Sequence, residues 1–399
     1  MLVIPAYAES ASLLDKLTSL AATDGRTLVI VVLNYPDSDS DAQVNMPLRS
    51  ALANLATQTD PALRRLNPHT DLYLHDLDSL RGPLPATEGV GLARKIGCDI
   101  AFKWICEGAI RGRWICSTDA DATLSPGYFQ SLAGLPAATT AATYPFRHTA
   151  GADSACNTAT ALYELRLHHY VLGLEYAGSP YAFHSLGSCL AVTADAYAQV
   201  HGFPKRAGAE DFYLLNKLAK ITPVARLQGE CLQLESRAST RVPFGTGPAV
   251  AAIIDTQKPL DIALFYHPAG FGALRAVLAT VAQLQAAELS ELKNLLRDEG
   301  LEPPLLEACE TVLLTMGLDR AIDHCRRQAN DCAQFMRQFH QWFDGFRTLK
   351  FIHGIRDAGW PVCSLAELDL QQPALWPSAK TSAIEDRRQA ILDHWSWSR

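Results

Sequence analysis

Trp114-Ile-Cys-Ser-Thr-Asp-Ala-Asp-Ala122 is the stretch of the chain that indicates its fold. Apolar and β-prone residues lead up to two carboxylates, Asp119 and Asp121, and the following Ser125-Pro126-Gly127 predicts a turn. In an open α/β sheet, ligands bind beyond the carboxyl ends of the strands. Two carboxylates at such an end suit a hard divalent cation that holds a phosphorylated ligand. We therefore expect this segment to hold a metal-bound nucleotide diphosphate at the edge of a sheet.

The segments before this stretch alternate between strand and helix patterns. Strands are predicted at 2–4, 27–33 and 73–75, and helices at 10–20, 48–55 and 89–106. The run 27–33 is apolar and β-branched throughout, as is typical of a strand buried on both faces. This alternation predicts an α/β fold with a mostly parallel sheet and helices on both faces.

The second half of the chain changes character near residue 280. Strands are predicted at 139–146, 186–192 and 224–227, and helices at 157–174, 193–200, 210–220, 281–298, 304–316 and 318–355. We therefore expect three parts: a sheet domain of residues 1–250, a connecting segment 251–280 and an all-helical C-terminal region 281–399.

Apolar residues within 318–355 recur at alternating steps of three and four, which is a heptad pattern. They are Ile322, Cys325, Ala329, Cys332, Met336, Phe339, Phe343 and Phe346. Most amphipathic helices cover a core of their own molecule, and this stripe would then pack on the sheet domain. The alternative is a homodimer interface or a docking surface for a partner.

Size and composition restrict the possible partners and location. The 399 residues can form two or three domains, and the net charge of −7 argues against a nucleic-acid partner.

The ten cysteines form no C-x-x-C pair, which favours a reducing cytoplasm. Residues 1–5 already have a strand pattern, so we expect no signal peptide. No apolar run has the roughly 20 residues of a membrane helix. The expected location is the cytoplasm, and the alternative left open is peripheral association with the inner face of the membrane.

Four sequence motifs occur in an order that resembles a known family. They are Val3-Ile-Pro-Ala-Tyr-Ala-Glu9, Gly89-Val-Gly-Leu-Ala-Arg-Lys-Ile-Gly97, Ser117-Thr-Asp-Ala-Asp121 and Gly208-Ala-Glu-Asp-Phe-Tyr-Leu-Leu215. Over roughly residues 1–245, this order resembles the GT-A glycosyltransferases, particularly family 2. The resemblance implies a Rossmann-like GT-A domain, with the helical C-terminal region outside it.

Three positions depart from the family pattern. Asn34 stands where the family has an acidic stretch that meets the nucleobase, Lys95 replaces an Asn, and Ala8 replaces the Asn before Glu9. The Q-x-x-R-W signature of processive polymerases is also absent. This absence favours transfer of a single sugar.

The resemblance implies roles for individual residues. Asp119 and Asp121 would hold Mn²⁺ or Mg²⁺ on the diphosphate, and Asp211, with Glu210 beside it, would carry the general base. The contacts to the sugar donor would come from Pro5, Ala6, Tyr7, Glu9, Asn34, Arg94 and Asp119.

Two further groups are candidates for the same site. Arg237 and Arg241 lie four residues apart in a loop rich in Ser, Thr and Gly, where guanidinium groups would bind phosphate oxygens as a lid. In some GT-A enzymes, mostly retaining ones, a C-terminal His completes the metal site, and His267 is the candidate here.

The expected reaction is transfer of one sugar from a nucleotide-diphosphate sugar, a UDP-sugar first, to a hydroxyl of a glycan or lipid-linked acceptor. Inversion of the anomeric carbon follows from the resemblance. Two alternatives stay open: a retaining transferase with His267 on the metal, and a non-catalytic scaffold that uses the helical region as its interface.

Overall fold

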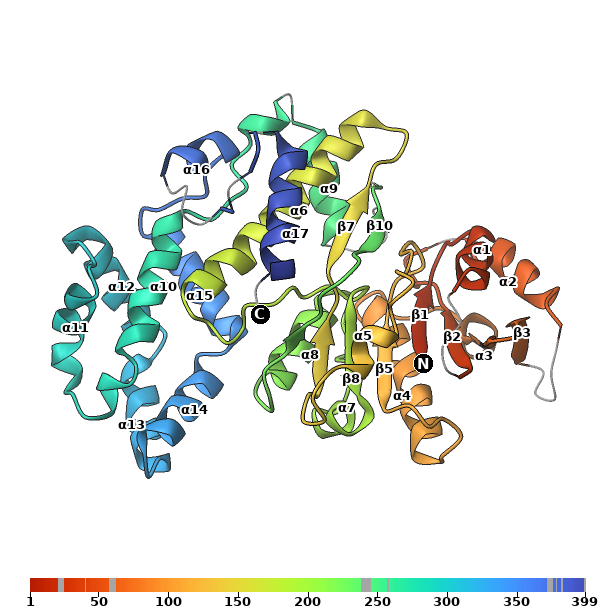
Figure 1. Cartoon of the computed structure of the whole chain (residues 1–399), viewed down its shortest axis with the longest axis horizontal. Helices are drawn as coiled ribbons and strands as arrows, with labels where there is room; N and C mark the ends of the chain where they lie inside the picture. Colours follow the sequence, from red (N-terminus) through yellow and green to blue (C-terminus); the bar gives the residue numbers. More distant parts are fainter. Residues whose placement is uncertain are drawn as a thin grey trace. The chain divides into compact units, whose positions relative to one another are not determined.

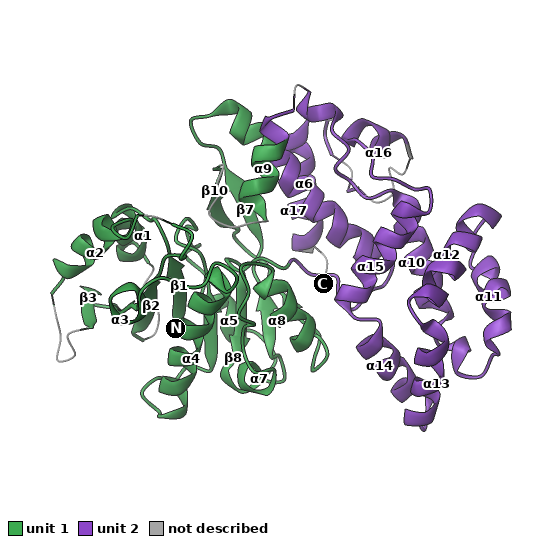
Figure 2. Ribbon diagram, turned by 180° about the vertical axis from the view of Figure 1, so that it is seen from behind, with its two compact units in different colours: residues 1–160, 185–252 green, residues 161–184, 253–399 purple. Residues whose placement is uncertain are grey.

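The computed structural model describes residues 1–20, 25–39, 41–56, 62–237, 245–256, 258–371, 376–377, 379–381 and 383–397. The chain forms two compact units, shown in green and purple in Figure 2. Unit 1 consists of residues 1–160 and 185–252, and unit 2 of residues 161–184 and 253–399. The predicted boundary at 250 lies close to one of these limits. The grouping of 161–184 with the C-terminal chain was not predicted.

Unit 1 is built on an eight-stranded sheet with the order β3-β4-β2-β1-β5-β8-β6-β9. The strands are β1 (Leu2–Ala6), β2 (Thr27–Leu33), β3 (Leu63–Asn67), β4 (Thr70–Asp76), β5 (Trp114–Ser117), β6 (Ala141–Thr143), β8 (Leu190–Thr193) and β9 (Ala225–Arg226). The four neighbours β4, β2, β1 and β5 run parallel, whereas β3 and β8 are antiparallel to the strands beside them. This sheet and the helical C-terminal region confirm the predicted α/β class.

The predicted strand 139–146 is right only for β6 (Ala141–Thr143), because Pro145 ends the strand there. Pro lacks the N–H that a central strand donates to its neighbour, so the chain leaves the main sheet after β6. It resumes as β7 (Phe146–Thr149), which pairs with β10 (Leu232–Glu235) in a separate two-stranded sheet. Figure 1 shows β7 and β10 side by side.

Helices flank the strands of unit 1. They are α1 (Ser12–Thr18), α2 (Met46–Ala53), α3 (Leu77–Arg81), α4 (Gly89–Cys106), α5 (Gln130–Ala133), α7 (Ala194–Gln199), α8 (Glu210–Leu218) and α9 (Thr246–Ile254). Of these, α1, α2, α4, α7 and α8 lie close to predicted helices, whereas α3, α5 and α9 were not predicted. Gly97 of α4 shows how closely helix and sheet approach, since an added Cβ would lie 2.5 Å from Cγ1 of Val3. The absence of a side chain at Gly97 therefore lets α4 lie directly on β1.

Unit 2 is helical. It contains most of α6 (Ser154–Tyr176), and its other helices are α10 (Pro268–Thr280), α11 (Leu292–Asp298), α12 (Pro303–Thr315), α13 (Leu318–Gln328), α14 (Cys332–Trp342), α15 (Gly345–Asp357), α16 (Leu365–Gln371) and α17 (Ile384–Trp397). The predicted helix 281–298 is wrong in its first half, where two short 3₁₀ turns, Gln283–Gln285 and Leu289–Glu291, precede α11.

The predicted single helix 318–355 is also wrong, because two aspartates start new helices within it. The Asp331 side chain accepts a hydrogen bond from the backbone N–H of Gln334, and Asp344 accepts one from that of Arg347. Such side-chain caps satisfy N–H groups that have no partner within the helix. The segment therefore forms three helices, α13, α14 and α15, which can fold back on one another.

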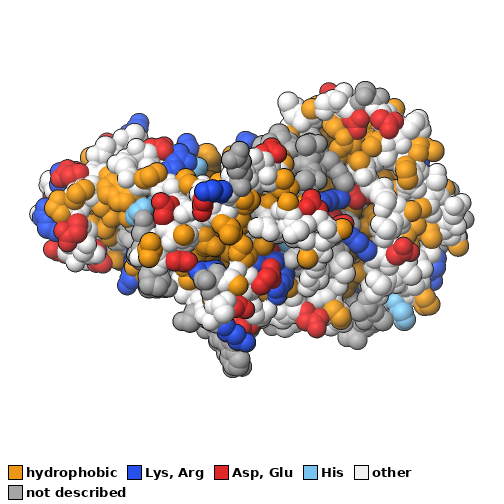
Figure 3. All heavy atoms as spheres, turned by 90° about the horizontal axis from the view of Figure 1, so that it is seen from above, with side chains coloured by type: hydrophobic (Ala, Val, Ile, Leu, Met, Phe, Trp, Pro, Cys, Tyr) orange, Lys and Arg blue, Asp and Glu red, His pale blue; other side chains and the backbone are white. Residues whose placement is uncertain are grey.

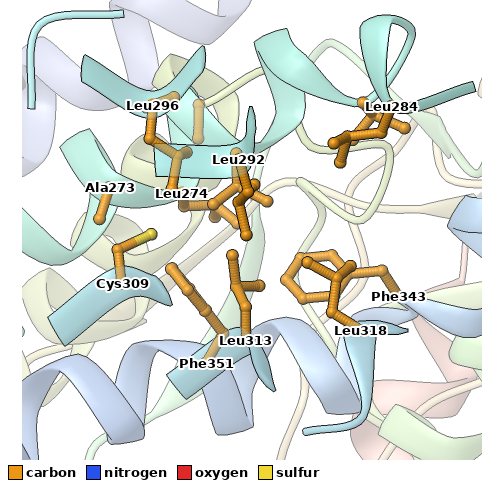
Figure 4. Close-up of a cluster of buried hydrophobic side chains, with 14 of the residues drawn as sticks. Ala273, Leu274, Leu284, Leu292, Leu296, Cys309, Leu313, Leu318, Phe343 and Phe351 are labelled. Atoms are coloured by element: carbon orange, nitrogen blue, oxygen red, sulfur yellow. The ribbon is translucent and has the colours of Figure 1, made fainter. Parts of the chain in front are cut away.

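The heptad stripe lies largely in the core of unit 2. Ile322, Cys325, Phe339 and Phe343 are buried, and Ala329 and Met336 pack against them. Figure 4 shows Phe343 in the same cluster as Leu292, Leu313 and Phe351. The stripe thus packs within the molecule as predicted, although its partners are residues of the helical unit itself. The other two members of the stripe, Cys332 and Phe346, are exposed.

The surface carries both signs of charge. On the face shown in Figure 3, the described Lys and Arg residues are interspersed with Asp and Glu, and no large basic patch gathers there. Within the described part of the chain, no helix has the length and apolar character needed to span a membrane.

Candidate active site

Arg94, on α4, connects two of the four sequence motifs with a third segment of the chain. Its Nη2 donates to Oδ1 of Asp119 at 2.7 Å, and its Nε donates to Oε1 of Glu210 at 3.0 Å. Its Nη1 donates to Oγ of Ser117 at 2.6 Å and to the carbonyl oxygen of Gly187 at 3.0 Å. Burial lowers the pKa of Arg94, but the charges of Asp119 and Glu210 outweigh this and raise it. Arg94 is therefore a permanent cation in the interior.

The start of α8 carries the acidic pair of the fourth motif. Glu210 is buried and bound by Arg94, whereas Asp211 is partly exposed and its Oδ1 accepts a hydrogen bond from the N–H of Phe212 at 2.7 Å. Although Asp211 is partly exposed, the surrounding protein excludes much of the water from its carboxylate. This desolvation and then the negative charge of Glu210 raise the pKa of Asp211 to about 7, against the opposing charge of Arg94. A carboxylate with such a pKa can accept a proton near neutral pH.

Backbone strain marks this acidic pair and the first motif. Ala209, immediately before Glu210, has φ +56°, and Ala8, immediately before Glu9, also has φ +56°. Non-glycine residues rarely adopt this left-handed conformation, and such residues cluster at functional sites. Both acidic segments therefore start from a conformation that the surrounding structure must enforce.

Asp121 lies among two cations and a second carboxylate. Arg237 Nη2 lies 2.8 Å from Oδ2 of Asp121 and 3.2 Å from Oε1 of Glu9, and Lys16 Nζ donates to the carbonyl oxygen of Asp121 at 3.1 Å. Burial and the charge of Asp119 raise the pKa of Asp121, and Arg237 opposes this shift. The cationic side chains of Arg237, Lys16 and Arg94 thus balance the negative charge of Glu9, Asp119 and Asp121. Guanidinium and ammonium groups of this kind also bind phosphate oxygens.

Two glycines of the second motif allow α4 to approach the segment before α8 closely. An added Cβ at Gly91 would lie 2.4 Å from the carbonyl oxygen of Arg206, and at Gly89 it would lie 3.2 Å from Cα of Ala207. The N–H of Gly91 donates to the carbonyl oxygen of Arg206 at 3.0 Å. The glycines of this motif therefore bring the Arg94 helix against the chain that leads to Glu210 and Asp211.

The predicted nucleobase contacts lie at the ends of β1 and β2. Asn34 is buried, and its side-chain NH₂ donates to the carbonyl oxygens of Ala6 at 3.1 Å and Val32 at 3.2 Å. Both of its side-chain protons are thus used within the protein. Pro5 is buried within β1, and the Tyr7 hydroxyl donates to Oδ2 of Asp39 at 2.7 Å.

Asn45 is a structural residue of this edge that sequence reasoning missed. It is fully buried; its Oδ1 accepts from the N–H of Ala8 at 2.9 Å, and its Nδ2 donates to the carbonyl oxygen of Asn34 at 2.9 Å and to Asp78 at 2.7 Å. An Asn directly before a helix normally suggests a helix cap. Because its partners come from three distant segments, the sequence contains no signal for this network.

The remaining candidate residues either make other contacts or lie outside the described structure. Arg241 lies outside the described residues. His267 belongs to unit 2, where its Nδ1 accepts a hydrogen bond from the N–H of Ala269 at 3.1 Å and caps α10; burial lowers its pKa. Lys95, which departs from the family pattern, forms an ion pair with Asp99 at 3.0 Å.

The carboxylates of Asp119 and Asp121 fit a divalent cation that arrives with its ligand. Among the described residues, no group of three or more His, Cys, Asp or Glu side chains could hold a metal ion. Mg²⁺ is commonly bound through one or two carboxylates and the phosphates of a substrate, and Mn²⁺ prefers similar oxygen ligands. Two carboxylates, each with one oxygen bound to an arginine, match that kind of site.

Comparisons with known proteins give similarity only at the level of solved structures. No protein-family model and no curated protein matches the chain. S. aureus TarS in complex with UDP-GlcNAc is 12% identical, with 85% of this chain and 88% of that chain covered and a TM-score of 0.38.

Two other glycosyltransferase structures have similar identities and TM-scores. The mannosyltransferase PcManGT from Pyrobaculum calidifontis, in complex with GDP-Man and Mn²⁺, is 15% identical over 84% of each chain, with a TM-score of 0.36. The M. tuberculosis glucosyl-3-phosphoglycerate synthase is 14% identical, with 63% of this chain and 76% of that chain covered and a TM-score of 0.35.

Proposed function

We propose that the chain is a metal-dependent GT-A glycosyltransferase that moves a single sugar from a nucleotide-diphosphate sugar to an acceptor hydroxyl, with inversion. The observation that supports this most is the bridge through Arg94. It connects Asp119 of the D-x-D motif with Glu210, next to Asp211. The D-x-D and E-D motifs are about ninety residues apart in the sequence, and their association provides a metal-binding carboxylate and a base in one site.

Each residue would have a distinct role in this reaction. Asp119 and Asp121 would hold Mn²⁺ or Mg²⁺, and the metal would neutralise charge on the departing diphosphate. Arg237, which contacts Asp121, would bind phosphate oxygens once the donor is present. Asp211 would accept the proton of the acceptor hydroxyl, since its pKa of about 7 lets it do so at neutral pH. The acceptor would be a glycan or a lipid-linked hydroxyl.

Nucleotide binding tests this proposal directly. A ligand that binds only the folded protein raises the melting temperature as its concentration exceeds its Kd. We would measure melting temperatures with UDP, GDP, TDP and CMP, each with and without Mn²⁺. We expect one nucleoside diphosphate, UDP first, to stabilise the chain only with metal, and Asp121→Ala to abolish the effect.

A matched control separates loss of the site from loss of the fold. Asp298→Ala removes an exposed carboxylate of unit 2 and should retain the nucleotide effect. If no nucleotide raises the melting temperature of the folded wild type, the transferase proposal is overturned and a non-catalytic scaffold on this fold becomes the better account.

A further inference from the structure

We propose that Arg94 is a positioning residue that holds the metal-binding carboxylate Asp119 and the start of α8 in one fixed arrangement. This inference rests on the proposed function, and it deepens it. The sequence prediction gave Arg94 a direct contact with the sugar donor. The contacts of Arg94 instead point to a role inside the protein, between the donor site and the base.

All three guanidinium nitrogens of Arg94 are already bound. They make four hydrogen bonds, to Ser117, Asp119, Gly187 and Glu210, and only 2% of the residue is exposed. These partners come from the end of β5, the segment before β8 and the first turn of α8. A group held in this way would have to abandon buried partners in order to reach a ligand, which is costly.

Gly187 forms the surface against which the Arg94 guanidinium lies. An added Cβ at this position would lie 2.5 Å from Nη2 and 2.8 Å from Cζ of Arg94, and the Gly187 carbonyl accepts from both Arg94 and Ser117. The Phe203 ring lies on another side, with its centroid 5.8 Å from Cζ. Even a methyl group at position 187 must therefore displace the guanidinium. The substitution changes the position of Arg94 without changing any charge.

Charge and shape both explain why arginine stands here. One planar guanidinium can bind several acceptors in fixed directions, which an ammonium group cannot do. Its positive charge compensates both the buried Glu210 and the partly exposed Asp119, two carboxylates that would otherwise repel each other. Residues that orient a metal ligand typically change metal affinity or activity by roughly 10- to 100-fold when they are altered.

The test displaces Arg94 by changing Gly187. Gly187→Ala is compared with wild type and with Gly134→Ala, whose added Cβ would meet no atom within 4 Å. The affinity for UDP is measured calorimetrically with and without Mn²⁺, together with the melting temperature of the ligand-free protein. We expect Gly187→Ala to weaken Mn²⁺-dependent UDP binding roughly 10- to 100-fold. Metal-free UDP binding should change little, and Gly134→Ala should match wild type.

A second variant keeps the inference testable if Gly187→Ala does not fold. Ser117→Ala removes one acceptor of Arg94 with little change in volume and should also reduce the Mn²⁺-dependent affinity. The inference is overturned if the folded variants bind Mn²⁺ and UDP as wild type does. It is also overturned if UDP affinity falls equally with and without metal, as a purely structural defect would produce. If wild type itself shows no metal-dependent binding of any nucleotide, the proposed function fails, and this inference fails with it.

Discussion

Asp211 is the residue whose environment best matches a chemical task. An aspartate in water is fully ionised at neutral pH and is therefore a weak base. Burial and the adjacent charge of Glu210 raise the pKa of Asp211 to about 7, which increases its affinity for a proton while much of it stays ionised. In the proposed function, Glu210 would hold a fixed negative charge beside Asp211, which would accept the proton.

Asp211→Asn should abolish most turnover and leave nucleotide binding intact. The amide has the size of the carboxylate but cannot accept the proton, and general-base catalysis typically contributes about 10²- to 10⁴-fold to the rate. Turnover is measured with the sugar donor that the nucleotide panel identifies, and binding by the metal-dependent melting shift. A loss of less than about tenfold would remove Asp211 from the base role and favour a retaining mechanism.

Glu210→Gln should shift the acidic limb of the pH–rate profile to lower pH. Asp211 must be deprotonated to act as a base, so activity falls as the pH drops through its pKa of about 7. Glutamine removes the negative charge that raises this pKa, so deprotonation should extend to lower pH. The check is kcat/KM between pH 5 and 9, with Glu107→Gln, an exposed carboxylate next to α4, as the control. A limb that stays in place or moves to higher pH contradicts the assignment.

At the scale of elements, a buried ion pair joins α17 to α6 within unit 2. Arg388 donates from Nε to Oε1 of Glu164 at 2.6 Å and from Nη2 to Oε2 at 2.9 Å. Glu164 is completely buried and Arg388 is 5% exposed. Removal of Arg388 leaves the buried charge of Glu164 without its guanidinium partner, and such a loss costs far more than the intact pair contributes.

Arg388→Met should therefore lower the free energy of unfolding by about 3–5 kcal/mol, and a Glu164→Leu/Arg388→Met double variant should recover much of that loss. Urea unfolding monitored by circular dichroism measures both. Lys293→Ala breaks ion pairs with Glu307 and Glu310 at a lysine side chain that is 36% exposed, and this control should cost less than about 1 kcal/mol. A double variant less stable than Arg388→Met would contradict the explanation.

At the scale of the whole molecule, the helical unit includes a segment from the middle of the sheet sequence. Residues 161–184 belong to unit 2, and Leu174 and Ala177 from this segment lie in its core with Phe271 of α10. The packing there is tight, since an added Cβ at Gly173 would lie 2.4 Å from the Phe271 ring. The C-terminal region therefore completes a core to which the central part of the chain contributes.

A truncated chain of residues 1–252 should not fold as an independent domain. It lacks every residue of unit 2 beyond 184, so Leu174 and Ala177 lose their buried partners. We expect this chain to bind a hydrophobic dye such as ANS and to unfold without a cooperative transition, unlike the full chain. Cooperative thermal unfolding of residues 1–252, together with metal-dependent nucleotide binding, would show that the helical region is dispensable.

The sequence by itself determined those features that depend on local pattern. The apolar β-branched run 27–33 predicted β2, the strand stretch before Asp119 predicted β5, and the order of four motifs predicted the acidic residues that Arg94 connects. Only the tertiary structure decided that Arg94 is buried between Asp119 and Glu210, and that Asn45 connects Ala8 with Asn34. The physical reason is range. Periodicity and turn residues act between near neighbours, whereas the partners of a buried charge or amide come from segments that meet only after the chain has folded.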